Sequence, residues 1–203
     1  MPLIEHKKHR NGFLVIWEIS DVEQCELNEL KLFPKATCYL NSLGSASRRK
    51  EWMAWHYLVR KFIGEYEVNY DRNGAPYLIG RSGFISISHC DNYTGLLYDE
   101  KNPCGIDIEN SSRKIDKITP RFLRSDENIL LHEEKLPELL IWCAKETLYK
   151  FYGEKGIDFL NDIKIDKINI TENQMSGIIK DRYKTLDYII TPEYTAVSTS
   201  FDK

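Results

Sequence analysis

The stretch Gly105-Ile106-Asp107-Ile108-Glu109 alternates strictly between apolar and acidic residues. This period-2 pattern predicts a short strand with Ile106 and Ile108 on one face and Asp107 and Glu109 on the other. Because side chains two positions apart in a strand point the same way, the two carboxylates converge on one place. They could hold a hard divalent cation such as Mg²⁺, which takes oxygen ligands and leaves room for water and phosphate. Alternatively, they form the solvent-facing side of a half-buried strand.

The composition is that of a globular protein with a real core, since 42% of the 203 residues are hydrophobic and 29% are charged. A net charge of −3 argues against non-specific binding of nucleic acid. The five cysteines are an odd number without C-x-x-C spacing, which disfavours both a disulfide framework and a zinc site. With no signal-peptide core and no apolar run of membrane length, we expect a cytoplasmic protein without a membrane partner.

In the first half of the chain, apolar patterns separated by turn residues predict five strands, at 12–19, 66–70, 77–79, 84–89 and 93–98. An acidic, leucine-spaced segment predicts a helix over 21–32. A second helix is expected from an N-cap at Ser47 to about Ile63, closed by Gly64. Basic residues in its first turn oppose the helix dipole, and such a local conflict often marks a functional site.

In the second half, residues 115–134 predict a broken helix, with Pro120 near a start and Ser125 as a second N-cap. A strong helix follows from Glu138 to about Tyr152 and ends at Gly153. Four β-rich stretches complete the chain, at 163–170, 175–180, 186–191 and 194–199.

The order strand, helix, strands therefore occurs twice. We predict an α+β fold of two similar halves, residues 1–100 and 101–203, in a pseudo-twofold arrangement. Each half would pack a small, mostly antiparallel sheet against one long helix. No sequence repeat between the halves is evident.

The helix over 138–152 carries a second candidate for chemistry. Trp142, Glu146 and Lys150 are spaced four residues apart, so they share one helix face, with Lys145 about a quarter-turn away. A Glu and a Lys at this spacing are also an ordinary surface pair, which contributes only ~0.2–0.5 kcal/mol. Trp142 on the same face favours a covered surface instead.

The third candidate is Ser86-Ile87-Ser88-His89. Ser88 and His89 at the end of a strand could donate hydrogen bonds to a phosphate. Alternatively, this is a core strand that ends in a hydrogen-bonded histidine. A Ser-His catalytic couple is disfavoured, because neighbours on a strand point to opposite faces.

In order along the chain, these motifs resemble the 4'-phosphopantetheinyl transferase superfamily. The resemblance covers residues ~48 to ~156, and the length of about 200 residues points to its surfactin-type branch. The most specific motifs are G-I-D-I-E and W-x-x-K-E-x-x-x-K. The others are Arg48-Arg49-x-Glu51-Trp52, Gly74-Ala75-Pro76-Tyr77-Leu78, Phe84 to His89, and Arg121-Phe122-Leu123.

The resemblance implies a Mg²⁺-dependent enzyme that moves the phosphopantetheine arm of coenzyme A onto a serine of an apo carrier protein, releasing adenosine 3',5'-bisphosphate. Asp107, Glu109 and Glu146 would hold the Mg²⁺. Glu146 would also accept the serine proton, directly or through a metal-bound water. Lys150, helped by Lys145, would neutralise charge on the phosphates. The catalytic residues would be Glu146, Lys150 and Asp107.

The same resemblance implies the residues that bind coenzyme A: Arg48, Arg49, Pro76, Tyr77, Ser88, His89, Lys145 and Lys150. His89 would lie nearest the 3'-phosphate, and Arg48 or Arg49 would grip it with a guanidinium fork. Pro76 and Tyr77 would line the adenine side.

Two other functions stay open at this point. The chain could bind coenzyme A or a carrier protein without chemistry, or it could be another Mg²⁺-dependent phosphotransferase, although it has no Walker-type loop. We expect a monomer. Residues 115–131, with Arg121, Phe122 and Arg124, are a candidate surface for the carrier protein; alternatively, this segment covers its own sheet.

Overall fold

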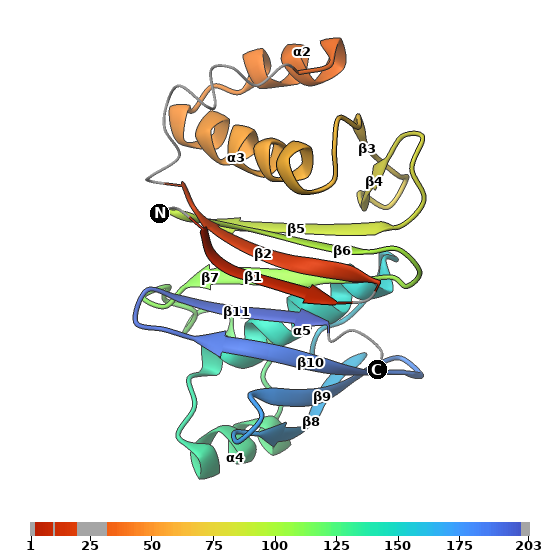
Figure 1. The fold of residues 1–203 in the computed structure, drawn as a ribbon. Coiled ribbons are helices and arrows are strands. Elements are labelled where there is room, and N and C mark those ends of the chain that lie inside the picture. Colours follow the sequence, from red (N-terminus) through yellow and green to blue (C-terminus); the bar gives the residue numbers. More distant parts are fainter. Residues whose placement is uncertain (1–2, 10, 20–31, 200–203) are drawn as a thin grey trace.

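The computed structural model describes residues 3–9, 11–19 and 32–199, and these build two antiparallel sheets (Figure 1). The first sheet has the order β1-β2-β6-β5 and the second the order β7-β11-β10-β9-β8. The first comprises β1 (Leu3–His9), β2 (Gly12–Glu18), β5 (Phe84–Cys90) and β6 (Tyr93–Asp99). The second comprises β7 (Ile106–Asn110), β8 (Ile163–Asn169), β9 (Gln174–Ile179), β10 (Arg182–Ile190) and β11 (Tyr194–Thr199). A small hairpin pairs β3 (Val68–Tyr70) with β4 (Pro76–Leu78).

The helices lie on the outer sides of the two sheets. They are α2 (Pro34–Ser42), α3 (Ala46–Phe62), α4 (Ser125–Glu134), α5 (Glu138–Tyr152) and a 3₁₀ turn, η2 (Thr119–Arg121). Figure 1 shows α3 over the first sheet and α5 against the second. None of the described helices has the length and apolar character needed to cross a membrane.

Strand β2 shows how the layers stack, because both of its faces are buried. Val15 and Trp17 belong to the core cluster that includes side chains of α3. Leu14 and Ile16 belong to a different cluster, together with Ile106 and other residues of the second sheet. The order of layers is therefore helix, sheet, sheet, helix, and the α+β prediction is confirmed at this coarse level. The pseudo-twofold relation and the division into domains at residue 100 stay predictions.

The two sheets also meet edge to edge, where β5 lies beside β7. No backbone ladder joins these two strands in the described structure. Instead, the Ile106 amide donates to Ser86 Oγ (3.0 Å) and the Ile108 amide donates to Ser88 Oγ (3.2 Å). Lys150 Nζ donates to the Ile106 carbonyl (2.9 Å). Side chains thus satisfy the edge groups of β7, as buried backbone groups require.

Several predicted elements are confirmed closely. The helix over 138–152 ends at Gly153, whose φ of 74° is the left-handed C-cap that glycine favours. The strands near 84–89, 93–98 and 105–109 lie where the alternation placed them. In β7, Ile106 and Ile108 are fully buried between the sheets, and the carboxylates face α5.

Other predictions about the elements are wrong. Helix α3 is capped by Ser45 rather than Ser47, and α4 by Arg124 rather than Ser125. The sequence also gave no expectation for β1 or α2. Residues 21–31 of the helix expected over 21–32 fall outside the described residues.

Gly105 permits the close approach of α5 to β7. A Cβ at this position would lie 2.2 Å from the Thr147 carbonyl oxygen and 3.0 Å from the Phe151 amide nitrogen. Both are backbone atoms of α5, and helix backbone cannot rotate away from a contact as a side chain can. We expect Gly105→Ala to lower the free energy of unfolding by about 3 kcal/mol, measured by urea denaturation. The matched control is Gly44→Ala, where a Cβ meets nothing within 4 Å; a loss equal to that of the control would contradict this account.

His56 on α3 makes the stability depend on pH. Burial lowers its pKa from 6.5 to about 3, although the bond to the Trp52 carbonyl (2.9 Å) opposes the shift. Between pH 6.5 and 3 the unfolded chain binds a proton here and the folded chain does not. The unfolding free energy therefore falls as the pH drops, by about 1.4 kcal/mol per unit from this group. Urea denaturation at pH 7.0 and at pH 5.5 measures this loss. Between these two pH values the unfolding free energy of His56→Gln should fall by less than that of the wild type. The control His132→Gln, at an exposed position, should show the same fall as the wild type.

Candidate active site

Asp107 lies at the centre of the candidate site, on β7 and facing α5. Its Oδ1 accepts hydrogen bonds from Ser88 Oγ (3.0 Å) and Lys150 Nζ (2.8 Å). Its Oδ2 is buried and has no strong hydrogen-bond donor within the described residues, although the thiol of Cys143 on α5, a weak donor, lies beside this carboxylate. A buried carboxylate oxygen without a strong donor is unusual, because desolvating it carries a free-energy penalty. This oxygen is therefore a candidate ligand for a cation.

Glu109 lies two residues further along the same face of β7. Its Oε1 accepts a hydrogen bond from Trp142 Nε1 (3.2 Å) on α5 and pairs with the guanidinium of Arg113. The Glu109 side chain is only 14% exposed. Both carboxylates of β7 therefore face α5, and each is engaged by a cation.

Glu146 faces the gap between these two carboxylates. Lys150 of α5 contacts Asp107, and Trp142, two turns earlier in the helix, contacts Glu109. Glu146 lies between Trp142 and Lys150 on the same helix face. Its pKa is raised, first by burial and then by the negative charge of Asp107, while Lys150 and Arg113 oppose the shift. The structure therefore brings Glu146 near Asp107, as the two motifs predicted.

The three carboxylates do not form a ready-made metal cluster. Within residues 3–9, 11–19 and 32–199, no three His, Cys, Asp or Glu side chains are grouped so that they could hold a metal ion. The donor chemistry nevertheless fits a hard cation, because all three groups are carboxylates and Asp107 Oδ2 is buried with no strong donor among the described residues. The unfavourable charge of Asp107 on Glu146 is the kind of repulsion that a bound cation relieves.

Lys145 is not part of this site, contrary to the prediction that it binds the nucleotide. Its side chain is fully buried on another face of α5 and forms an ion pair with Glu127 (2.9 Å). Its Nζ also donates to three backbone carbonyls, those of Phe122, Phe159 and Ile163, at 2.7–3.0 Å. An ammonium group with these partners and no exposed surface cannot reach a ligand in the cleft. Lys145 is a structural residue of the second half.

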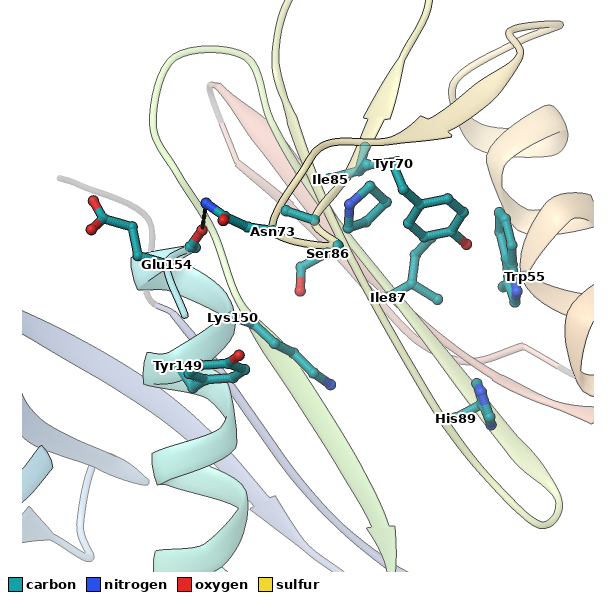
Figure 2. Close-up of a pocket in the computed structure, with 14 residues that line it drawn as sticks. Trp55, Tyr70, Asn73, Ile85, Ser86, Ile87, His89, Tyr149, Lys150 and Glu154 are labelled. Atoms are coloured by element: carbon teal, nitrogen blue, oxygen red, sulfur yellow. Dashed lines mark hydrogen bonds between the residues drawn. The ribbon is translucent and has the colours of Figure 1, made fainter. Parts of the chain in front are cut away.

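A pocket opens beside Lys150, lined by residues of α3, the β3–β4 hairpin, β5 and α5 (Figure 2). Lys150 and Tyr149 enter from α5, Trp55 enters from α3, and Ile85 and Ile87 enter from β5. The turn between β3 and β4 closes one side, where Asn73 Nδ2 donates to the Gly153 carbonyl (2.9 Å). The further lining residues are Tyr70, Gly74, Ala75, Pro76, Ser86, His89, Gly153 and Glu154. The pocket therefore combines aromatic and aliphatic walls with a lysine and a histidine.

His89 stands at the far end of β5 (Figure 2) and is held from α3. Its Nδ1 lies 3.4 Å from Glu51 Oε2, and Ser47 Oγ donates to the other oxygen of Glu51 (3.0 Å). The pKa of His89 is lowered, mainly by burial, with Glu51 acting against the shift. Its side chain is still 46% exposed, so it can meet a ligand.

Of the other residues predicted to bind coenzyme A, only some lie at the pocket. Pro76 lines the pocket, whereas Tyr77 is 41% exposed and lines a neighbouring hollow. Ser88 is buried, and its hydroxyl is taken by Asp107 and the Ile108 amide. Arg48 is exposed, and Arg49 donates to the Leu43 carbonyl.

The surface proposed for the carrier protein at 115–131 needs a correction. Phe122 is fully buried and packs against Trp142 with ring centroids 5.2 Å apart. Ile115 and Leu131 are buried in the same core cluster. An apolar side chain that is already covered cannot contact a partner. The alternative, a segment that covers its own sheet, is the one that the structure supports for Phe122.

Sequence reasoning missed three side chains of the site: Trp55, Tyr70 and Arg113. Trp55 had no site role in the sequence analysis, and Tyr70 was expected only at the end of a strand. Arg113 is four residues after Glu109, a spacing that predicts contact on a helix but not on a strand that ends in a turn. The turn signal Asn110-Ser111-Ser112 was the clue that the chain folds back there.

Comparison with known proteins agrees with part of this site. Residues 103–196 match the family model described as the 4'-phosphopantetheinyl transferase superfamily. The matched segment contains β7 and α5, and therefore Asp107, Glu109, Glu146 and Lys150. It supports a transferase of this kind, for which coenzyme A and a carrier protein are the implied partners. A search of the curated proteins found no match.

Proposed function

We propose that the chain is a 4'-phosphopantetheinyl transferase of the surfactin-type branch. It transfers the phosphopantetheine arm of coenzyme A to a serine of an apo carrier protein and releases adenosine 3',5'-bisphosphate. One observation carries the proposal: within the family-matched segment, Lys150 and the carboxylates of Asp107, Glu109 and Glu146 face one place, and Lys150 also lines the adjacent pocket.

Asp107, Glu109 and Glu146 would hold a Mg²⁺ ion. The ion would supply charge neutralisation at the pyrophosphate of coenzyme A, where the phosphorus is attacked. Asp107 Oδ2, which is buried and, among the described residues, has only the weak thiol donor of Cys143 beside its carboxylate, supports a ligand role. Ser88 holds the other oxygen of Asp107 and so fixes the direction in which Oδ2 points.

Lys150 neutralises charge on the transferring phosphate. Its Nζ is bound to Asp107 on the carboxylate side, its stem lines the pocket, and its side chain is 28% exposed. A lysine between the pocket and the carboxylates is placed to meet an anion that enters from the pocket.

Glu146 accepts the proton of the carrier serine. It does so directly or through a metal-bound water, and burial of its side chain favours the protonated form of the carboxylate. Proximity supplies much of the effect, because the serine must be held beside Glu146 for the transfer.

Coenzyme A lies in the pocket beside Lys150. Trp55, Tyr70 and Pro76 offer flat apolar surface for the adenine, and His89 offers a donor for the 3'-phosphate. Between the two candidate arginines, Arg48 is the better placed. It lies three residues before Glu51 on α3, on the side that contacts His89, whereas Arg49 is turned to Leu43.

Mass spectrometry of an apo carrier protein tests the proposal. Incubation with the enzyme, coenzyme A and Mg²⁺ should add the mass of one phosphopantetheine, and a carrier with its serine replaced by alanine should gain nothing. A panel of fatty-acid, polyketide and peptide-synthetase carriers identifies the client. If no carrier gains mass, and calorimetry shows coenzyme A binding that does not respond to Mg²⁺, the chain is a non-catalytic binding module.

We also propose that the protein works as a cytoplasmic monomer. Analytical ultracentrifugation with and without coenzyme A checks the oligomeric state.

A further inference from the structure

Arg113 reaches the carboxylates from a turn at the end of β7. Asn110 builds that turn: its Oδ1 accepts from the Ser112 amide (2.9 Å), and its carbonyl accepts from the Arg113 amide (2.9 Å). The turn brings Arg113 back over the strand that it has just left. The Arg113 side chain is 39% exposed, whereas the Glu109 side chain that it pairs with is 14% exposed.

The guanidinium has two partners, and those partners contact each other. It forms an ion pair with Glu109 Oε1, and it lies over the ring of Trp142 at 5.5 Å from the centroid. Trp142 Nε1 donates to the same Oε1 (3.2 Å). Both interactions are favourable for an arginine, which pairs with carboxylates and stacks on aromatic faces.

We infer that Arg113 is an exchangeable counterion of the metal site: it neutralises Glu109 while the metal is absent and leaves when Mg²⁺ binds. Trp142 is the positioning residue, which keeps Glu109 aimed at the site through its N–H when Arg113 has left. This inference rests on the proposed function, because it requires that Glu109 be a metal ligand.

The exposure of Arg113 and the aromatic packing of Trp142 explain why Arg113, and not Trp142, would be the mobile partner. The partly exposed guanidinium regains its hydration when it swings away, and the cation then neutralises the largely buried Glu109 carboxylate in its place. Trp142 is anchored between Phe122 (5.2 Å between centroids) and Phe159 (5.7 Å). Its indole therefore stays in place whether or not the cation above it is present.

Binding of Mn²⁺ to the full chain, followed by electron paramagnetic resonance without coenzyme A, tests the inference. Arg113→Gln should bind Mn²⁺ about fivefold to tenfold more tightly than the wild type, because one competing positive charge is gone. The matched control is Arg182→Gln on β10, which removes a guanidinium that also lies over an aromatic ring, that of Tyr152 at 4.8 Å. The control should bind Mn²⁺ as the wild type does.

Two results would overturn the inference, and they are distinguishable. If Asp107→Asn abolishes Mn²⁺ binding but Arg113→Gln leaves the affinity unchanged, only the role of Arg113 is wrong. If the wild type and Asp107→Asn bind Mn²⁺ equally poorly, the metal site of the proposed function fails as well.

Tryptophan fluorescence gives a readout that does not depend on the Arg113 variant folding. Titration of the wild type with Mg²⁺ should change the emission, because a cation leaves the face of Trp142. In Trp142→Phe this response should disappear. A response that survives intact in Trp142→Phe would count against displacement of Arg113.

Discussion

Asp107→Asn is expected to reduce phosphopantetheine transfer by about a thousandfold while the protein stays folded. The amide keeps the size of the side chain and one oxygen for Ser88, so the packing around β7 is retained. It removes the negative charge that pairs with Lys150 and replaces one potential metal ligand with a donor. Loss of one such electrostatic group from a preorganised site typically lowers the rate by two to three orders of magnitude, ~10²–10³.

The measurement is single-turnover transfer to an apo carrier protein, with circular dichroism and thermal unfolding as evidence of folding. Asp116→Asn is the matched control, because Asp116 is exposed on a loop of the same half. The control should transfer at the wild-type rate. Transfer by Asp107→Asn within about tenfold of wild type would remove Asp107 from the mechanism.

Substitutions of the two lysines of α5 should have different effects, one on the free energy of unfolding and the other on transfer activity. Lys145→Met leaves Glu127 buried without its cation, and breaking a buried ion pair from one side typically destabilises a protein by about 3–5 kcal/mol. Lys150→Met should keep most of the stability, because Asp107 retains Ser88 and the Lys150 position is partly exposed. It should lose transfer activity.

Urea denaturation and the transfer assay measure the two effects. The double variant Lys145→Met/Glu127→Gln should recover part of the lost stability, since a neutral amide is less costly to bury than an unpaired carboxylate. Glu127 also accepts from the amides of Ile165 and Arg124, and the amide oxygen can serve one of them. If Lys145→Met were stable but inactive, the assignment of Lys145 as structural would be wrong.

The contrast between these lysines also shows which site residues helical spacing can predict and which it cannot. Helical spacing placed Lys150 on the face of Glu146 and Trp142. Lys150 contacts Asp107 and Trp142 contacts Glu109, so both of these side chains face β7. The same spacing put Lys145 a quarter-turn away, close enough to be counted with the site. What decides its role is Glu127, which lies on α4 and is brought to it only by the packing of α4 and α5.

The role of Phe122 was also left open by the sequence. It lies between two arginines in a segment with turn residues, and this pattern was equally compatible with a surface contact residue and with a core residue. The sequence could not decide, because both uses need the same apolar side chain. Burial against Trp142 decided it.

By itself, the sequence determined the local geometry of the site. The two-residue period of 105–109 fixes the faces of β7, and the 3.6-residue period of 138–152 fixes which side chains of α5 can act together. These periods depend only on neighbouring backbone, so they can be read without knowing the rest of the fold. Tertiary structure alone decided the serine-bridged edge between β5 and β7, the pocket beside Lys150, and the return of Arg113 to Glu109. Such contacts join segments whose relative position depends on turns and on packing across the whole chain, which no local period records.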